Sequence, residues 1–298
     1  MLRSLFTGIS GLSAHQQLLD VTSNNIANVN TNGYKSTSAV FEDTLSQTMR
    51  GASGAYPGAS AATDTQGGLN AVQVGLGVKM AGTTTDFTQG STQTTGRGLD
   101  VMVDGDGFLI VKDAGVISYT RAGSLSLDTA GHLVEPNGAI VQGWSTSQYT
   151  NPIPAGTPAM TTVTTGAPSN ITLTGLADGS GNYKSYSIGS DGSINAVRQN
   201  GTIDKLGVIA LASFPNPNGL QKVGDSEYAV TANSGTATIG QPLSMASLGS
   251  LTAGALEMSN VNLATELTNL IIAERGYQAN SRTISASDEV LQTLVQLQ

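Results

Sequence analysis

The chain has 298 residues, and only 11% of them are charged, against about 25% in an ordinary soluble domain. The absence of cysteine excludes disulfide scaffolds, thiol catalysis and cysteine-based zinc sites, and two histidines leave little for a metal centre or a catalytic base. A net charge of −8 argues against nucleic-acid binding, which needs a basic face.

The N-terminal segment predicts an amphipathic helix. From Leu2 to Ile26, mostly apolar residues recur at alternating spacings of three and four, which is a heptad pattern held for more than three heptads. Its large apolar members include Leu5, Ile9, Leu12, Leu19 and Ile26. The helix is expected to end near residues 28–33, where Asn and Gly tolerate left-handed geometry. Glycine and serine interrupt the apolar run and no small-x-small site follows, so no cleaved signal peptide is expected.

The middle of the chain has a different composition. Residues 34–98 are rich in Ser, Thr, Gly and Ala and predict an extended connector with short strands, chiefly Val72 to Met80. Residues 99–259 show the alternation and turn spacing of an antiparallel β domain. Its expected strands are Phe108 to Val111, Ser118 to Ala122, Ser124 to Leu127, Ile171 to Leu173, Tyr186 to Ile188, Ile194 to Val197, Val208 to Ser213 and Glu227 to Val230. A Pro- and Thr-rich stretch near residues 145–183 is expected to be a surface excursion that contributes little to the core.

The C-terminal segment predicts a second amphipathic helix that begins at Leu263. Its heptad pattern includes Leu263, Leu267, Leu270, Tyr277, Ile284 and Leu291. Either Asn260 or Asn262 could cap it. The predicted fold is therefore α+β: residues 1–33 and 260–298 form a coiled-coil-like helix pair, and the centre forms an antiparallel β domain. No stretch is long enough to span a membrane.

No motif carries catalytic, cofactor or metal chemistry. The glycines from Gly75 to Gly82 do not have dinucleotide-loop spacing, and no helix pattern follows them. Asp104 and Asp106 lack the further oxygen ligands of a calcium loop, so they are interpreted as turn residues. We therefore predict no catalytic residues, no cofactor and no metal site.

Polar residues within both heptad patterns favour a partner outside the chain. Gln16, Glu274 and Asp288 lie on the predicted seams, where burial in the core of one molecule would be unfavourable. In an assembly of many copies, such groups can fix register. The seam residues Leu5, Ile9, Leu12, Leu19, Ile26, Leu263, Leu267, Leu270, Tyr277, Ile284 and Leu291 are thus predicted to be polymerisation contacts.

Several motifs resemble one family. Residues 24–35 resemble the N-terminal motif of bacterial flagellar rod and hook proteins; the matching positions are Asn24, Asn25, Asn28, Thr31, Gly33, Tyr34 and Lys35. Residues 75–100 and 254–263 look like those of hook proteins in particular, and residues 266–297 are similar to the family's C-terminal motif. Long hook proteins carry a large outer domain where only residues 145–183 stand here, and this shortness is similar to the distal rod protein.

The resemblance implies a structural subunit of the flagellum that self-assembles into the hook, with the distal rod as the alternative. It implies helix pairs around a central channel, export by the flagellar apparatus without signal cleavage, and a location in the hook or basal body. The implied partners are further copies of the chain, the rod, hook–filament junction and hook cap proteins, and the export apparatus. A secreted β-rich adhesin and an enzyme are the other classes weighed. An adhesin would not require the two terminal helices with heptad patterns.

Overall fold

A computed structural model describes residues 2–54, 68–145, 167–173, 183–198, 201, 203–245 and 247–296. The chain forms two compact units. The helix–ribbon unit contains residues 1–27, 37–84 and 262–298, and the β unit contains residues 28–36 and 85–261. The three-part division expected from the sequence, with changes at 33/34, 98/99 and 259/260, differs from this one. Residues 37–84 of the expected connector belong to the helix–ribbon unit, and residues 28–36, 85–98 and 260–261 belong to the β unit.

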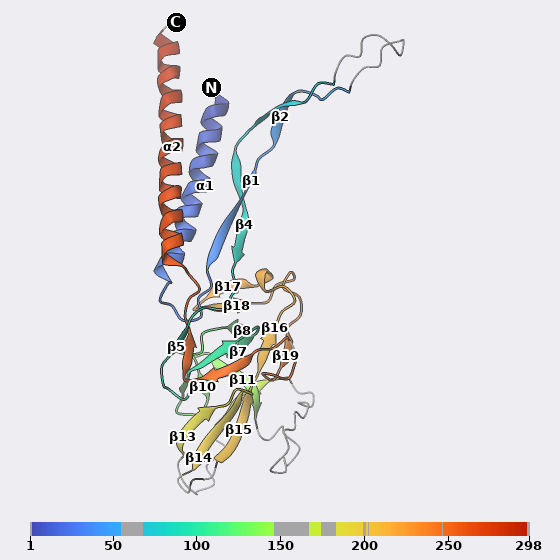
Figure 1. The fold of residues 1–298 in the computed structure, drawn as a ribbon, viewed down its shortest axis with the longest axis vertical. Helices are drawn as coiled ribbons and strands as arrows, with labels where there is room; N and C mark the ends of the chain where they lie inside the picture. Colours follow the sequence, from blue (N-terminus) through green and yellow to red (C-terminus); the bar gives the residue numbers. More distant parts are fainter. Residues whose placement is uncertain are drawn as a thin grey trace. The chain divides into compact units, whose positions relative to one another are not determined.

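The helix–ribbon unit is built on the two predicted terminal helices. Helix α1 spans Leu2–Ala27 and helix α2 spans Leu263–Gln296 (Figure 1). The side chain of Asn262 caps α2, because its Oδ1 accepts hydrogen bonds from the backbone N–H groups of Ala264 at 3.1 Å and Thr265 at 3.4 Å. Asn260, the other expected cap, lies in the β unit and accepts a hydrogen bond from Ser36 N–H. The α+β fold class is confirmed.

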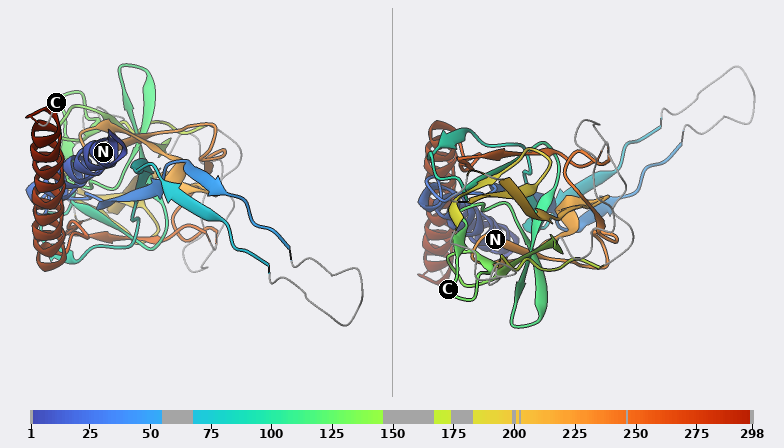
Figure 2. Two further views of the ribbon diagram at one scale, coloured as in Figure 1. Left: turned by 90° about the horizontal axis from the view of Figure 1, so that it is seen from above. Right: turned by 90° about the horizontal axis from the view of Figure 1, so that it is seen from below.

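A two-stranded ribbon completes this unit. Strand β1 (Thr37–Asp43) pairs with β4 (Val78–Thr85), and β2 (Ser46–Arg50) pairs antiparallel with β3 (Val72–Gly75). The single strand expected from Val72 to Met80 is broken at Leu76 and Gly77. Figure 2 shows the ribbon leading away from the helix pair. A two-stranded ribbon is only marginally stable in water, so it depends on contacts outside itself.

The β unit is an antiparallel assembly of short strands. The main path runs β13 (Tyr183–Ile188), β14 (Ser193–Arg198), β15 (Ile203–Ile209), β11 (Ile140–Ser145), β7 (Phe108–Asp113), β8 (Val116–Thr120), β18 (Glu227–Ala229) and β17 (Gln221–Gly224). Attached to it are β9 (Ser126–Leu127), β10 (Leu133–Val134), β12 (Ser169–Asn170), β16 (Leu211–Ser213) and β19 (Thr238–Gly240). Two further pairs are β20 (Ser250–Ala253) with β6 (Val101–Asp104) and β21 (Ala255–Glu257) with β5 (Thr92–Thr94).

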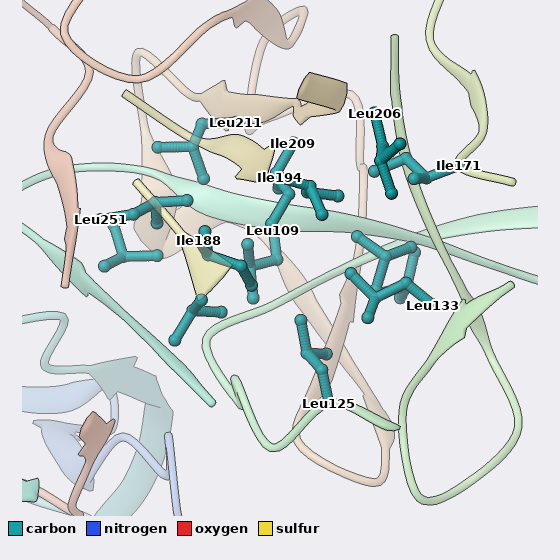
Figure 3. Packing of buried hydrophobic residues seen from close by; sticks show 14 of the residues in the cluster. Leu109, Leu125, Leu133, Ile171, Ile188, Ile194, Leu206, Ile209, Leu211 and Leu251 are labelled. Carbon is teal, nitrogen blue, oxygen red and sulfur yellow. The ribbon is translucent and has the colours of Figure 1, made fainter. Parts of the chain in front are cut away.

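Two apolar clusters form the core of the β unit. Figure 3 shows side chains of one cluster, including Leu109, Ile194 and Ile209, that come from different strands and meet in one interior. The second cluster is aromatic, and in it the rings of Tyr119 and Phe214 meet edge to face with centroids 4.8 Å apart. The run expected as one strand from Val208 to Ser213 is mostly buried, but it is interrupted at Ala210: β15 ends at Ile209, and β16 begins at Leu211 with other partners.

One sequence prediction about the core was wrong. Ile171 and Leu173 lie within the stretch expected to be a surface excursion, yet both are buried in the first cluster. Backbone hydrogen bonds hold them, because Ile171 N–H donates to Val141 O at 3.3 Å and Leu173 N–H donates to Gly131 O at 2.7 Å. The rest of the excursion, residues 146–166 and 174–182, lies outside the described residues.

Within the part of the β unit that the structure describes, Glu135 is one of four buried acids, together with Asp100, Glu227 and Glu257. The side chain of Glu135 is only 3% exposed, and its Oε1 has no hydrogen-bond partner among the described residues. Burial, together with repulsion from nearby Glu227, raises the pKa of Glu135 to about 8, while a hydrogen bond with the Thr120 side chain acts in the opposite direction. Glu135 is therefore mostly protonated near neutral pH in the folded chain.

Candidate assembly surface

The helix pair packs through small and polar residues. The two helices run antiparallel, with Ser4 Oγ 3.4 Å from Ser287 Oγ near one end and Asn25 Nδ2 3.1 Å from Glu266 Oε1 near the other. Between them, a Cβ added at Gly11 would lie 2.6 Å from Asn280 Nδ2. The helices approach closely at Gly11 because this position carries no side chain.

The same close approach repeats along the pair. A Cβ added at Gly8 would lie 3.1 Å from Cγ1 of Ile284, and one added at Gly276 would lie 2.4 Å from Cε1 of His15. The facing positions on α1 are Ser4, Gly8, Gly11, His15 and Asn25, and those on α2 are Glu266, Gly276, Asn280, Ile284 and Ser287. Their spacings are three, four or ten, and ten is the sum of two threes and one four. On α1 these positions define a seam one position away from the predicted apolar seam. We call the facing positions of both helices the small-residue seam.

The large apolar residues of both helices lie mostly outside the small-residue seam. Of the residues predicted as polymerisation contacts, Ile9, Leu263, Leu267 and Tyr277 are exposed, and Leu5, Leu12, Leu19, Ile26, Leu270, Ile284 and Leu291 are half-buried. Ile284 also belongs to the small-residue seam, because a Cβ added at Gly8 would lie 3.1 Å from its Cγ1. The sequence did not indicate Ile271 and Ile272, which are 54% and 57% exposed on α2. Seventeen of the 25 exposed large apolar side chains among the described residues belong to the helix–ribbon unit.

Asn25 joins the end of α1 to the ribbon. Its amide makes a double hydrogen bond to the backbone of Thr37, donating from Nδ2 to Thr37 O at 2.8 Å and accepting from Thr37 N–H at 3.0 Å. Asn25 is 1% exposed, so both bonds form away from water. Asn24, its neighbour in the motif, is exposed on α1. The motif asparagines thus differ in role: Asn25 fixes the direction in which the chain leaves the helix.

Lys35, also a motif residue, lies at a buried charge cluster in the β unit. Its Nζ is 2.6 Å from Glu257 Oε1 and donates to Thr88 O at 2.7 Å. Arg121 Nη1 lies 3.5 Å from Glu257 Oε2, so one carboxylate is placed between two cations. Burial lowers the pKa of Lys35, although Glu257 opposes that change. The cluster links the N-terminal motif to strand β21 near the start of the C-terminal motif.

The remaining motif residues shape the turn between Asn25 and Lys35. Asn28 Oδ1 accepts a hydrogen bond from the Thr31 hydroxyl at 3.0 Å. Gly33 has a φ of +68°, donates to Glu257 O at 2.8 Å, and approaches Arg121 and Ala122 so closely that a Cβ would lie 2.6 Å from Ala122 N. Lys222 Nζ lies 4.5 Å from the centre of the Tyr34 ring. The sequence alone does not show these contacts, because the partners are far apart along the chain: Lys35 and Glu257 are 222 positions apart.

Among the described residues, no three His, Cys, Asp or Glu side chains lie close enough to hold a metal ion. Within the same residues, no helix is both long and apolar enough to cross a membrane. A helix pair that leaves many large apolar side chains exposed or half-buried, in a chain with a separately packed β unit, is typical of a structural subunit whose surfaces are completed by neighbouring molecules.

Comparison with known proteins gives the family. Three family descriptions match: "Flagella basal body rod protein" over residues 5–35, "Flagellar hook protein FlgE/F/G D1 domain" over residues 102–196, and "Flagellar basal body rod FlgEFG protein C-terminal" over residues 252–297. The chain is 39% identical over 297 residues to the flagellar basal-body rod protein FlgG of Bacillus subtilis, covering 100% of this chain and 99% of that protein. It is 31% identical to the flagellar hook protein FlgE of Borreliella burgdorferi, covering 100% of both over 448 aligned residues.

A third relative is the basal-body rod protein FlgG of Buchnera aphidicola from Acyrthosiphon pisum. It is 37% identical to this chain, and the alignment covers 100% of both proteins. The chain belongs to the flagellar rod and hook protein family, the structural axial proteins of the bacterial flagellum. The family's members are structural proteins, in keeping with a role other than catalysis.

Proposed function

We propose that this chain is a subunit of the distal rod of the flagellar basal body, where copies polymerise through the apolar faces of α1 and α2. The exposed apolar side chains of the helix–ribbon unit carry the proposal of polymerisation. Leu267, Ile271 and Ile272 are each at least 45% exposed on one short stretch of α2, and covering them would remove apolar surface from water. The small-residue seam holds the pair together without using these side chains, which leaves them for neighbouring copies.

Length supports the rod over the hook. The alignment with the Bacillus subtilis rod protein runs over 297 residues, close to the 298 of this chain, whereas the alignment with the Borreliella burgdorferi hook protein needs 448. The additional length in the hook relative must lie in insertions. The hook, predicted first from the motifs at residues 75–100 and 254–263, remains the second candidate, favoured by those motifs and by the 31% identity.

Export by the flagellar apparatus without a cleaved signal peptide belongs to the same proposal. The subunit is expected to meet other rod proteins at one end of its segment and the hook at the other. Burial of the helix faces on addition to the growing end couples ordering to assembly. Heterologous contacts that do not close into a ring then extend the structure as a helical tube.

Deletion of the gene, followed by electron microscopy of isolated basal bodies, tests the proposal. A distal rod subunit is needed before the hook can be added, so the deletion strain should have a shortened rod, no hook and no motility. A complete rod without a hook would support the hook instead. Normal flagella in the deletion strain would contradict both assignments. Restoration by a plasmid copy of the wild-type gene is the control.

A further inference from the structure

A groove in the helix–ribbon unit lies near the junction of α1, α2 and β1. It has a volume of about 270 Å³ and is lined on its apolar side by Leu18, Val21, Phe41 and Ile272. An apolar cavity of about 150 Å³ is large enough to hold benzene, so an aromatic side chain fits here. Ile272 lines the groove and is also 57% exposed, so it connects the groove with the exposed apolar surface of α2.

Glu266 gives the groove its charge. It is the one ionisable residue in the lining, and its Oε1 accepts the hydrogen bond from Asn25. No lysine or arginine of the described chain lies within ion-pairing distance of Glu266, although all 13 are among the described residues. A partner for this groove should therefore combine a bulky apolar group with a cation.

The first turns of α1 have that chemistry. Phe6 is 67% exposed, whereas the other four phenylalanines of the chain are buried or half-buried. Arg3 is the only cation in α1, is exposed, and forms no ion pair among the described residues. A cation in the first turn opposes the helix dipole by roughly 0.3–1 kcal/mol. The stability of the isolated helix therefore does not explain Arg3, and an external carboxylate does.

The two surfaces cannot meet within one molecule. Phe6 and Leu18 are 12 residues apart on the same straight helix, which corresponds to about 18 Å. The first turns of α1 lie at the end of the pair that carries both chain termini (Figure 1). The groove lies toward the other end, because its lining includes Val21 near the end of α1 and Glu266 near the start of α2. Two different surfaces at opposite ends of one unit form a heterologous contact, which repeats from copy to copy without closing.

We propose that the N-terminal end of α1 docks into the α1–α2–β1 groove of a second copy, with Phe6 among the apolar side chains and Arg3 paired with Glu266. This contact rests on the proposed polymerisation and names a specific pair of surfaces for it. It is distinct from the small-residue seam, which acts within each chain.

The absence of natural cysteine makes a direct crosslinking test possible. Cells without their own copy of the gene express Phe6→Cys and Ile272→Cys together, and each variant alone serves as the control. Oxidation of isolated basal bodies should give a 6–272 disulfide between chains, identified by mass spectrometry, at least tenfold above either control. An intrachain bond is excluded because bridged Cα atoms lie within about 7 Å. Ser4→Cys with Ser287→Cys is the positive control and should bridge within one chain.

Charge reversal tests the ionic half of the contact. Arg3→Glu and Glu266→Lys should each reduce the number of complete rods at least tenfold, and the double variant should restore it to within threefold of wild type. Glu266→Gln keeps an oxygen for Asn25 and separates loss of charge from loss of that hydrogen bond, so it should give a smaller defect than Glu266→Lys. Circular dichroism of each purified variant verifies folding.

Normal rods without the 6–272 disulfide, a 6–6 disulfide in its place, or failure of the double variant to restore assembly would overturn this contact. None of these results would affect the proposed function, which fails if the deletion strain builds normal flagella or a complete rod without a hook. A 6–272 disulfide together with rescue by the double variant would support the contact.

Discussion

The two units of the chain differ in whether they bury or expose their large apolar residues. The β unit buries its large side chains in two clusters contributed by many strands. In the helix–ribbon unit, the buried apolar residues among those described are Ala14 and Ala273, and the buried polar ones are Thr22 and Asn25. The β unit therefore contains its own core, whereas the helix–ribbon unit leaves its large apolar side chains exposed or half-buried, as one side of an interface does.

The largest expected effect is on assembly. Leu267→Asp should abolish rod formation, because an unpaired carboxylate buried against a neighbour costs several kcal/mol. Since Leu267 is 45% exposed in the single chain, the β unit should fold normally and keep its circular dichroism signal. Electron microscopy of basal bodies gives the measurement. The same change at Val116, an exposed residue of the β unit, should leave rods intact, and normal rods from the Leu267 variant would show that this face is not an interface.

The sequence predicted the helices better than their contacts. Heptad spacing marks residues that need burial, and it correctly located α1 and α2. It did not show that Gly8, Gly11 and Gly276 would make the intrachain contact, because glycine contributes nothing to an apolar pattern. The partner of Asn25 was equally hidden: its amide binds the backbone of Thr37, and any residue type at position 37 would offer the same groups. The turn predicted at Asp104 and Asp106 lies between β6 and β7, and it could be predicted because it has a local cause: Gly105 between the two acids has a φ of +99°.

The cluster around Lys35 tests whether the N-terminal motif belongs to the β unit in the single chain. Lys35→Met removes one of the two cations beside Glu257, and breaking a buried pair in this way costs about 3–5 kcal/mol. We expect a loss near the lower value, about 3 kcal/mol, because Arg121 still faces the carboxylate. Urea denaturation followed by tryptophan fluorescence reports on the β unit through Trp144. The control Lys184→Met changes an exposed lysine and should have little effect. An unchanged urea midpoint for Lys35→Met would show that residues 28–36 do not contribute to the stability of the β unit.

Glu135 gives the β unit a pH dependence that the helix–ribbon unit should not share. Its pKa is raised from 4.5 to about 8 in the folded chain, so the folded state holds a proton that the unfolded state releases. For this group alone, the free energy of unfolding is therefore greatest below about pH 4.5. It falls as the pH rises from there through about 8. Glu135→Gln should remove this dependence and stabilise the β unit by about 2 kcal/mol at pH 8, allowing for relaxation around the charge. Thermal unfolding at pH 6 and 8.5 measures it. A slope that persists in the variant would assign the dependence to another group.

The smallest effect concerns the start of α2, where the helix–ribbon unit depends on a local hydrogen bond. Asn262 is exposed, and its Oδ1 accepts from two backbone N–H groups that have no partner within the helix. Asn262→Ala should lower helix stability by about 1 kcal/mol, while Asn262→Asp retains the acceptor and adds a charge that the helix dipole favours. Helical circular dichroism of the purified chain on heating should show earlier melting for the Ala variant and none for the Asp variant. Because tertiary burial contributes little to this unit, a local cap should matter more here than in the β unit. Equal melting of all three chains would mean that the intrachain contacts of α2, and not its cap, set its stability.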